Sequence, residues 1–260
     1  MAVINRIKEI YEYREMIFTS VHRELRGRYK GSVLGFLWTF INPLFQLLVY
    51  TMVFSVVLRS NIEKYYLYLF VALIPWIFLA SSITGGASCV YGQAGMVTKI
   101  YFPRQVLPIA FVTTCFVNML LCFIVVIVVF AVSIGINLRV LPYLIPTMLI
   151  EYILALGIAF LVSGITVFFR DLEHILGIVV MAWQFLTPIM YPITMVPERL
   201  MPIFNLNPMT PVIGAYRSIM YYKSAPDLST MLSALIWGVF FLVTGGYLFD
   251  RLQKRFAEVL

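Results

Sequence analysis

The chain has 260 residues, of which 62% are hydrophobic and only 12% are charged, and its mean hydropathy is +0.93. A soluble domain is about 45–50% apolar and about 25% charged, so this apolar excess cannot be buried in one globular core and indicates a lipid environment. The net charge of +7 does not indicate nucleic-acid binding, because most basic residues flank apolar segments, as contacts with lipid headgroups require. The apolar runs are also too long for the short alternating strands of a membrane β-barrel.

The N-terminal segment is amphipathic. Over residues 4–29 apolar side chains recur at steps of three and four residues, with charged side chains between them. This pattern predicts a helix lying in the membrane interface, which we assign to residues 1–32. No secretory signal peptide is expected, because the first thirty residues lack an apolar core and a small-residue cleavage site. Four residues just before the first span are candidates for an interfacial gate: Arg23, Arg26, Arg28 and Tyr29.

Six apolar segments predict six transmembrane helices, at about 34–58, 65–91, 106–135, 142–168, 175–191 and 228–249. Six spans put both termini on one side of the membrane. That side carries thirteen Lys and Arg residues and the other side six, so we expect cytoplasmic termini. The predicted fold is an all-α polytopic membrane protein, with a transmembrane domain at 33–250 and a cytoplasmic tail at 251–260.

The segment between the fifth and sixth spans is rich in proline. Pro208 and Pro211 interrupt the apolar stretch 203–222, so too few residues follow before Lys223 for a further span of about twenty. Broken backbone at membrane depth is tolerated only inside protein or beside a cavity. We therefore predict re-entrant helices within residues 193–224 rather than a seventh span.

The sequence shows no motif for nucleotide binding, catalysis or metal binding. It has no Gly-x-x-x-x-Gly-Lys-Ser/Thr phosphate-binding loop, no plausible Ser/His/Asp arrangement and no Cys/His cluster with metal spacing. The three cysteines, Cys89, Cys115 and Cys122, lie in apolar segments and are expected to be packing residues. We expect no enzymatic activity here, so energy must come from a partner or from an ion gradient.

Five segments between residues 14 and 250 carry a family resemblance: 23–44, where the amphipathic helix runs into the first span, and 99–108, 168–172, 187–192 and 207–211. Together they resemble the permease subunits of type-2 ABC transporters that export polysaccharides such as O-antigen, capsule or teichoic acid. The resemblance implies a homodimer in a bacterial cytoplasmic (inner) membrane, with a lipid-linked glycan as substrate. It also implies an ABC ATPase partner that binds ATP and Mg²⁺, and no cofactor in this chain.

Two alternatives to this function remain open. A related type-2 ABC permease for a drug or another lipid would carry much of the same pattern. A gradient-driven carrier or channel, without any ATPase, is the alternative from a different class. The family motifs and the proline-stiffened loop at 97–105 favour the ATP-driven exporter.

The resemblance places the first cytoplasmic loop in a cleft of the ATPase. Charged and proline-stiffened residues can transmit a rigid-body movement, and the second cytoplasmic loop is a further candidate for contact with the ATPase or the N-terminal helix. The alternative is that these residues only anchor the topology or form a solvated turn. The coupling candidates are Lys99, Tyr101, Phe102, Pro103, Arg104, Arg170 and Asp171.

A polysaccharide is too polar to cross hydrocarbon and needs an enclosed route. The spans contain few charged groups, so neutral polar and aromatic side chains must line it, and we expect a path along the dimer interface bounded by the first and fifth spans. Helix packing, lipid contact and an aromatic belt are the alternatives for the same side chains. The candidates are Trp38, Gln46, Tyr50, Phe116, Phe123, Trp183, Gln184 and Tyr191.

Glu151 is the one acid that we place within a span. A carboxylate in the membrane is costly and points to a specific partner or function. It could bind a substrate hydroxyl, bridge to the re-entrant segment through Arg217, or carry protons. We favour a structural polar contact, because a proton-coupled carrier needs more than one buried titratable group.

Overall fold

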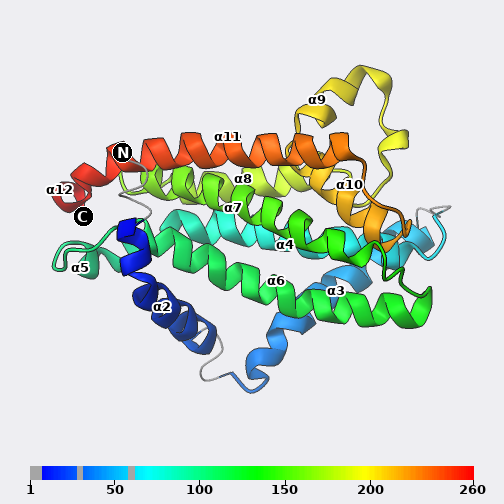
Figure 1. Cartoon of the computed structure of the whole chain (residues 1–260), viewed down its shortest axis with the longest axis horizontal. Coiled ribbons are helices and arrows are strands. Elements are labelled where there is room, and N and C mark those ends of the chain that lie inside the picture. Colours follow the sequence, from blue (N-terminus) through cyan, green and yellow to red (C-terminus); the bar gives the residue numbers. More distant parts are fainter. Residues whose placement is uncertain (1–7, 28–31, 58–61) are drawn as a thin grey trace.

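The computed structural model describes residues 8–27, 32–57 and 62–260, and within these ranges it contains helices and turns but no strand. This confirms the prediction of an all-α protein. In Figure 1 the long helices run side by side along the long axis of the molecule. The principal helices are α2 (Arg14–Gly27), α3 (Trp38–Thr51), α4 (Tyr65–Ser88), α6 (Val106–Ser133), α7 (Leu144–Thr166), α8 (Leu172–Phe185), α10 (Met209–Met220) and α11 (Leu228–Leu252).

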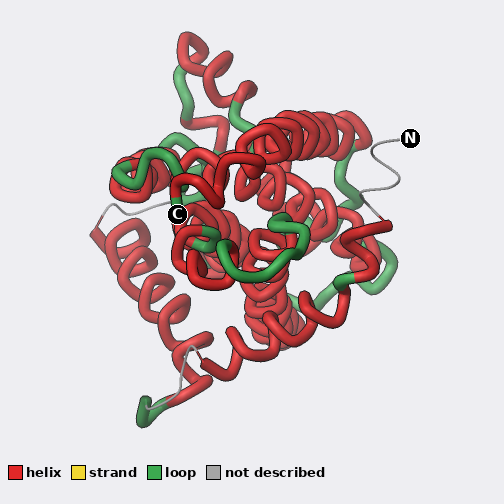
Figure 2. Tube along the Cα trace, turned by 90° about the vertical axis from the view of Figure 1, so that its left-hand side faces the viewer, coloured by secondary structure: helices red, strands yellow, loops and turns green. Residues whose placement is uncertain are grey.

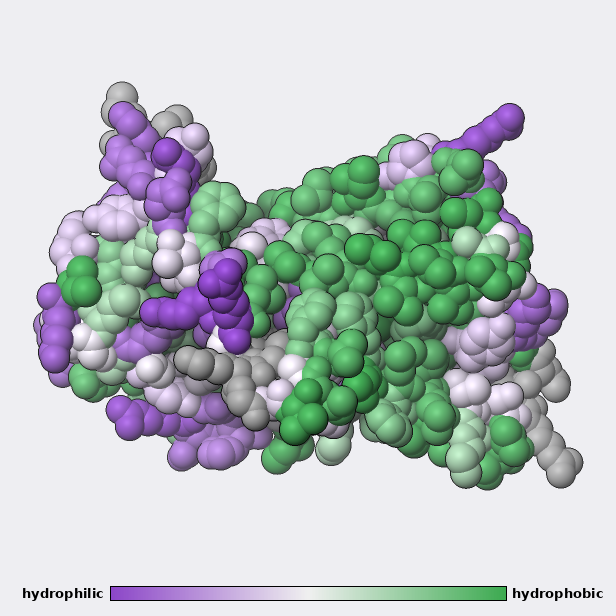
Figure 3. Space-filling view, turned by 90° about the horizontal axis from the view of Figure 1, so that it is seen from below, coloured by the Kyte–Doolittle hydropathy of each residue, from purple (hydrophilic) through white to green (hydrophobic). Residues whose placement is uncertain are grey.

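The protein is a polytopic membrane protein. A backbone in hydrocarbon must satisfy its own N–H and C=O groups, which is why the long apolar runs fold as helices. Figure 3 shows one face of the molecule with a broad apolar band between two polar ends. Five helical segments in the described ranges are long and apolar enough to cross a membrane: Gly35–Val57, Tyr65–Ser88, Val106–Ser133, Leu141–Thr166 and Leu228–Val259.

Helix α8, which lies in the segment predicted as the fifth span, is shorter than these five. Its 14 residues rise by about 21 Å, less than the hydrocarbon core of about 30 Å. The segment predicted to span the membrane over 175–191 is helical only to Phe185, and turns follow up to Tyr191. Pro188 and Pro192 explain this end, because proline has no N–H to continue the helix.

The contact between α7 and α11 is the closest in the bundle. A Cβ atom built on Gly245 would lie 2.0 Å from the carbonyl oxygen of Gly157, and one built on Gly157 would lie 2.3 Å from the backbone nitrogen of Leu242. Small residues let two backbones approach in this way, which is a common means of joining helices in membranes. The pair forms a dense wall on one side of the bundle.

Helix α3 packs much more loosely. Only 6% of the apolar window in Gly35–Val57 is buried, against 78% in Tyr65–Ser88. The helix contains Pro43 and continues as a π-helix over Met52–Val57. Figure 1 shows α3 inclined across the bundle rather than parallel to it. One whole face of this helix is therefore left without a partner in the protomer.

The proline-rich segment forms two short helices, α9 (Met201–Leu206) and α10, preceded by 3-10 turns at Ile193–Met195 and Glu198–Leu200. Helix α10 packs against α4, α7 and α11, whereas α9 stands away from the bundle in both Figure 1 and Figure 2. The break between them is at Asn207-Pro208, as the prolines predict. Residues 193–224 are all described, and no helix among them is long enough to be a seventh span.

The two ends of the bundle carry different elements. The α5 end carries α2, α5 (Ala94–Val97) and α12 (Phe256–Val259), and Figure 2 views the molecule from this end. The opposite end, with α10 and the start of α11, is the α10 end. At the α5 end an apolar cluster joins the loop before α6, the end of α7 and the C-terminal tail; its members include Phe102, Val167, Phe249 and Phe256.

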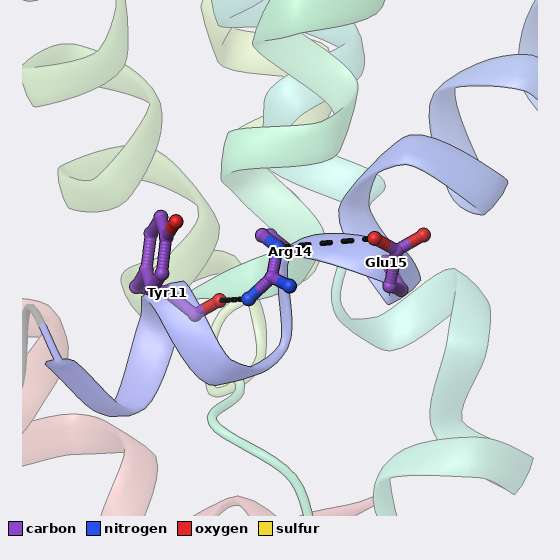
Figure 4. Close-up of polar contacts among 3 residues, drawn as sticks. All are labelled: Tyr11, Arg14 and Glu15. Atoms are coloured by element: carbon purple, nitrogen blue, oxygen red, sulfur yellow. Dashed lines mark hydrogen bonds and ion pairs between the residues drawn. The ribbon is translucent and has the colours of Figure 1, made fainter.

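The amphipathic N-terminal segment is helical but bent. Residues 8–12 are helical, Tyr13 forms a turn, and α2 follows. Val21 of α2 is buried, and Met16 and Ile17 pack on the cluster at the α5 end. Figure 4 shows Arg14, which donates a hydrogen bond to the Tyr11 carbonyl oxygen and lies 3.8 Å from a carboxylate oxygen of Glu15. The charged side chains thus contact one another on the open face of this segment.

Candidate functional site: a groove between three helices

A groove of about 290 Å³ lies between α3, α4 and α8. Helix α3 contributes Gln46 and Tyr50, and α8 contributes Gln184. The Gln184 side-chain amide donates a hydrogen bond of 3.3 Å to the Tyr50 hydroxyl, which joins α3 to α8. The remaining lining comes mainly from α4, with three residues of α8: Trp76, Ile77, Ala80, Ser81, Thr84, Gly177, Val180 and Met181. We call this feature the α3–α8 groove.

The chemistry of the groove is polar and uncharged. Amides and hydroxyls line it, and among the residues that the structure describes no Asp, Glu, His, Lys or Arg contributes to the lining. Neutral amides and hydroxyls can form hydrogen bonds with sugar hydroxyls, and aromatic faces can pack on the C–H faces of sugar rings, without attracting ions. The structure thus brings together three of the eight residues predicted for a substrate path, between the first and fifth apolar segments.

The other five predicted path residues lie elsewhere. Trp38 lines a separate cavity of about 160 Å³ beside α6 and donates to the Ser32 hydroxyl. Trp183 packs edge-on against Trp76 and donates to the Asn207 side chain, and Tyr191 donates to the Phe185 carbonyl oxygen. None of the three is among the residues that line the groove.

The two phenylalanines of α6 that were predicted to line a path, Phe116 and Phe123, face other helices of the protomer. Phe116 packs against Phe78 and Tyr152, and Phe123, which is 1% exposed, packs against Tyr216. Both rings lie on the face of α6 turned towards α4, α7 and α10. Within the protomer these rings contribute to helix packing.

Glu151 of α7 is fully buried and contacts α10. Its carboxylate accepts a hydrogen bond of 2.6 Å from the Tyr216 hydroxyl. Arg217, one of the partners considered for Glu151, instead donates to the carbonyl oxygens of Pro188 and Ile189 and stacks on Tyr68. Glu151 thus makes a polar contact with the re-entrant segment through Tyr216 and not through Arg217.

Asn207 was not singled out from the sequence, although it joins two proline motifs. Its side-chain oxygen accepts bonds from the Trp183 indole and the Met209 backbone N–H, and its amide donates to Leu186 and Thr187. One side chain thus fixes the end of α8 to the start of α10. An asparagine before a proline in an apolar segment is the signal that could have found it, because its amide must be satisfied there.

The first loop at the α5 end has a buried side and an exposed side. Phe102 is 4% exposed and lies in the apolar cluster, while Arg104 donates to the Gln253 carbonyl oxygen and Gln105 to the Asp250 carboxylate. Tyr101, by contrast, is 83% exposed, and Lys99 is exposed beside it. Pro103 is half-buried between the two sides. The loop is therefore fixed to the C-terminal tail and presents a short exposed tip.

The second loop at this end contacts the first. The Arg170 guanidinium lies 5.9 Å from the centre of the Tyr91 ring, and the Tyr91 hydroxyl donates a hydrogen bond to Glu173. This hydrogen bond, more than any other influence, raises the pKa of Tyr91 above its ordinary value. Asp171 is exposed at the start of α8. The two loops form one surface.

Two of the four candidate gate residues, Arg23 and Arg26, lie on α2. Arg23 and Arg26 are exposed on α2, and Arg23 lines a cavity of about 210 Å³ between α2, α4 and α6. Arg28 and Tyr29 lie outside the described residues. Helix α2 therefore places Arg23 beside a cavity that α4 and α6 also line.

Comparisons with known proteins identify the family. Residues 15–221 match the model of the ABC-2 type transporter family. The chain belongs to this family. It is 35% identical over 259 residues to the O-antigen export system permease protein RfbA of Myxococcus xanthus, covering 98% of this chain and 99% of that protein. It is 32% identical over 252 residues to a protein of the same name from Klebsiella pneumoniae, covering 95% of each.

Membership of the ABC-2 type family implies a partner protein. Such a permease works with an ABC ATPase, which must contact the membrane subunit on one side of the membrane. The match runs from the start of α2 to the end of α10, and so includes the groove and both loops of the α5 end.

Proposed function

We propose that this chain is the membrane subunit of an ATP-driven exporter of a lipid-linked polysaccharide, of the O-antigen, capsule or teichoic acid type, in a bacterial cytoplasmic membrane. The observation that carries the proposal is the α3–α8 groove. It offers neutral amide and hydroxyl groups on a side of the bundle that is otherwise apolar and unpacked. The relatives named as O-antigen export permeases support this substrate class.

A second copy of the chain would close the groove. Gln46 is exposed in the protomer, and an amide facing hydrocarbon costs several kcal/mol, on the order of 2–7 by transfer measurements. Covering α3 and α8 with the same helices of a second protomer would enclose the groove and remove this penalty. The proposed complex has two permease chains and two ATPase subunits, and ATP and Mg²⁺ bind to the ATPase.

The α5 end is the proposed ATPase contact. Its tip exposes Lys99, Ile100 and Tyr101, while Phe102 and Arg104 fix the same loop to the rest of the protein. A movement of the ATPase applied to the tip would reach α6 and the C-terminal tail. This assignment puts both termini in the cytoplasm, in agreement with the excess of basic residues on that side.

A gradient-driven carrier is less well supported by the same geometry. None of the described residues that line the groove is charged, and the buried acid Glu151 is bonded to Tyr216 away from the groove. A substrate path of this kind supplies no proton site. The uncharged lining therefore favours a neutral, hydroxyl-rich substrate driven by a separate ATPase.

The test is the glycan on the surface of cells that depend on this chain. Depletion should remove the polysaccharide, as measured by mass spectrometry of surface glycans, and unchanged glycans would exclude the proposed function. The double variant Gln46→Leu/Gln184→Leu keeps the volume but removes both amides, and should lower surface glycan by about tenfold, equivalent to about 1.4 kcal/mol. Thr244→Val, on α11 and outside the groove, is the matched control. If depletion removes the glycan but the double variant exports normally, the groove is not the path.

A further inference from the structure

A larger cavity lies at the α10 end, away from the groove. Its volume is about 540 Å³, and it lies between the turns that follow α8, the end of α9, helix α10 and the first turns of α11. We call it the α10 cavity. Among the cavities described it is the largest, and none of its lining residues belongs to the α3–α8 groove.

Arg217 makes this cavity unusual for a membrane protein. The side chain is only 5% exposed and yet lines the cavity. Two of its nitrogens bond to backbone carbonyls, the third, Nε, is buried without a partner, and the guanidinium lies 3.6 Å from the centre of the Tyr68 ring. No carboxylate in the described ranges forms an ion pair with it. A buried cation without a counter-ion is costly and creates a strong local field that favours an anion.

The rest of the lining is rich in hydroxyl and amide groups. The Thr210 hydroxyl is buried without a partner, as is the Nε of Arg217. Helix α11, with 25 residues, begins at this cavity, so the positive end of its dipole faces the same region. The polar residues that complete the lining are Thr194, Asn205, Ser218, Tyr222, Ser229, Thr230 and Ser233.

We propose that the α10 cavity is a binding site for an anionic group, a phosphate or carboxylate, carried on a hydroxylated unit. Arg217 and the start of α11 supply positive potential, and the surrounding hydroxyls supply hydrogen bonds to a polyol. Two sources have this chemistry: a charged sugar of the exported glycan, and the glycerol phosphate headgroup of a phospholipid. The first source rests on the proposed function, and the second does not.

The deciding variant must leave Arg217 in place. Arg217→Gln would also remove the contacts to Pro188 and Ile189 and can unfold the re-entrant segment. The double variant Thr230→Leu/Ser233→Leu fills the cavity from α11 and removes two hydroxyls without touching these contacts. Thr244→Leu, on the same helix but outside the cavity, is the matched control, because its hydroxyl bonds only to carbonyls of its own helix.

Binding is measured on the purified transporter, chain and ATPase together. Isothermal titration with glucose 1-phosphate should show binding about tenfold tighter than with glucose, weakened about tenfold by the α11 double variant and unchanged by Thr244→Leu. Native mass spectrometry after exchange into phosphatidylglycerol tests the lipid source with the same variants. Retained phosphatidylglycerol that is lost in the double variant supports the site with a lipid ligand.

The outcomes separate this site from the proposed function. Binding is measured without export, so loss of surface glycan on depletion decides the function and leaves the binding result independent. If the wild-type transporter binds neither glucose 1-phosphate nor phosphatidylglycerol, the proposal is overturned. A probe that the double variant and Thr244→Leu bind equally is not held in the α10 cavity, and if this is true of every probe that binds the wild type, the proposal is also overturned.

Discussion

The α7–α11 wall and the α3–α8 groove lie in the same bundle but are built in opposite ways. In the wall, Gly157 and Gly245 bring two backbones into contact. In the groove, a Cβ atom added to Gly177 would meet no neighbouring atom within 4 Å, and the two helices are joined by one hydrogen bond of 3.3 Å. Dense packing and open polar surface are thus separated in this bundle, so that one side holds the fold and the other is available to a partner or substrate.

Polar groups follow the same division. In the dense part, Glu151 is bonded to Tyr216 at 2.6 Å, and Thr113 to Tyr152 at 2.9 Å. On the open side Gln46 is exposed. These two contacts give polar groups inside the bundle a partner, and leaving such a group unpaired is costly, whereas an exposed amide at membrane depth indicates a surface completed by something else.

The largest expected effect is the loss of folded protein in Gly245→Val. The added atoms would meet the backbone of Gly157, which cannot move aside as a side chain can, so the destabilisation should exceed the usual overpacking range of about 1–3 kcal/mol. Unfolding in detergent, followed by circular dichroism, measures it. Gly246→Val, the next residue, has open space at its Cβ and is the control for helix propensity. Gly177→Val in the groove should fold normally, and equal losses at Gly177 and Gly245 would break the comparison.

The next effect extends the contrast to two neighbouring residues of the first loop at the α5 end. Phe102→Ala should destabilise the protein by about 3 kcal/mol, because it empties a place in the apolar cluster. Tyr101→Ala should leave stability unchanged, because the side chain is 83% exposed, and should instead lower ATP hydrolysis by the complex. Thermal unfolding and phosphate release measure the two quantities. Normal ATP hydrolysis in Tyr101→Ala would show that Tyr101 at the exposed tip does not take part in coupling to the ATPase.

A smaller effect compares two tyrosine hydroxyls. Tyr216→Phe leaves the buried Glu151 carboxylate without its donor and should cost about 1–3 kcal/mol of stability. Tyr50→Phe removes the longer bond to Gln184 beside an open groove and should cost at most about 0.5 kcal/mol. Parallel unfolding curves of the two variants give the difference. A Tyr50→Phe loss as large as that of Tyr216→Phe would show that the groove is structural.

Much of the fold could be predicted from the sequence because the signals are local. Long apolar runs must be helical in lipid, and Pro208 breaks the segment between α9 and α10 wherever it packs. The end of α8 at Phe185 was placed too late, since an apolar run does not itself show that Pro188 and Pro192 end the helix. The proposed location of the termini follows from the charge distribution alone.

The site was harder to predict, because it depends on which face of each helix meets which neighbour. Glu151 needed a donor, and Tyr216 and Arg217 are adjacent candidates on one helix. Successive residues of a helix point about 100° apart, so only one of them can face α7. The sequence alone does not say which. Phe123 shows the same limit: its aromatic side chain made it a candidate for the path, but the contact with Tyr216 shows that it is turned inwards.

The smallest effect concerns the contact between the two loops of the α5 end. Tyr91 donates a hydrogen bond to Glu173 on a half-buried surface, so Tyr91→Phe should cost only about 0.5–1.5 kcal/mol. The raised pKa of Tyr91 fixes the pH dependence. Below the ordinary value of 10.0 the hydroxyl is protonated in both folded and unfolded chains, so the difference between wild type and variant should be constant from about pH 7 to pH 9. Above it the unfolded chain loses the proton first, and the advantage of the wild type should decline. If the stability difference between wild type and Tyr91→Phe grew with alkaline pH, Tyr91 would not donate to Glu173. The two loops would then lack the hydrogen bond that joins them, and their contact would be as loose as that between α3 and α8.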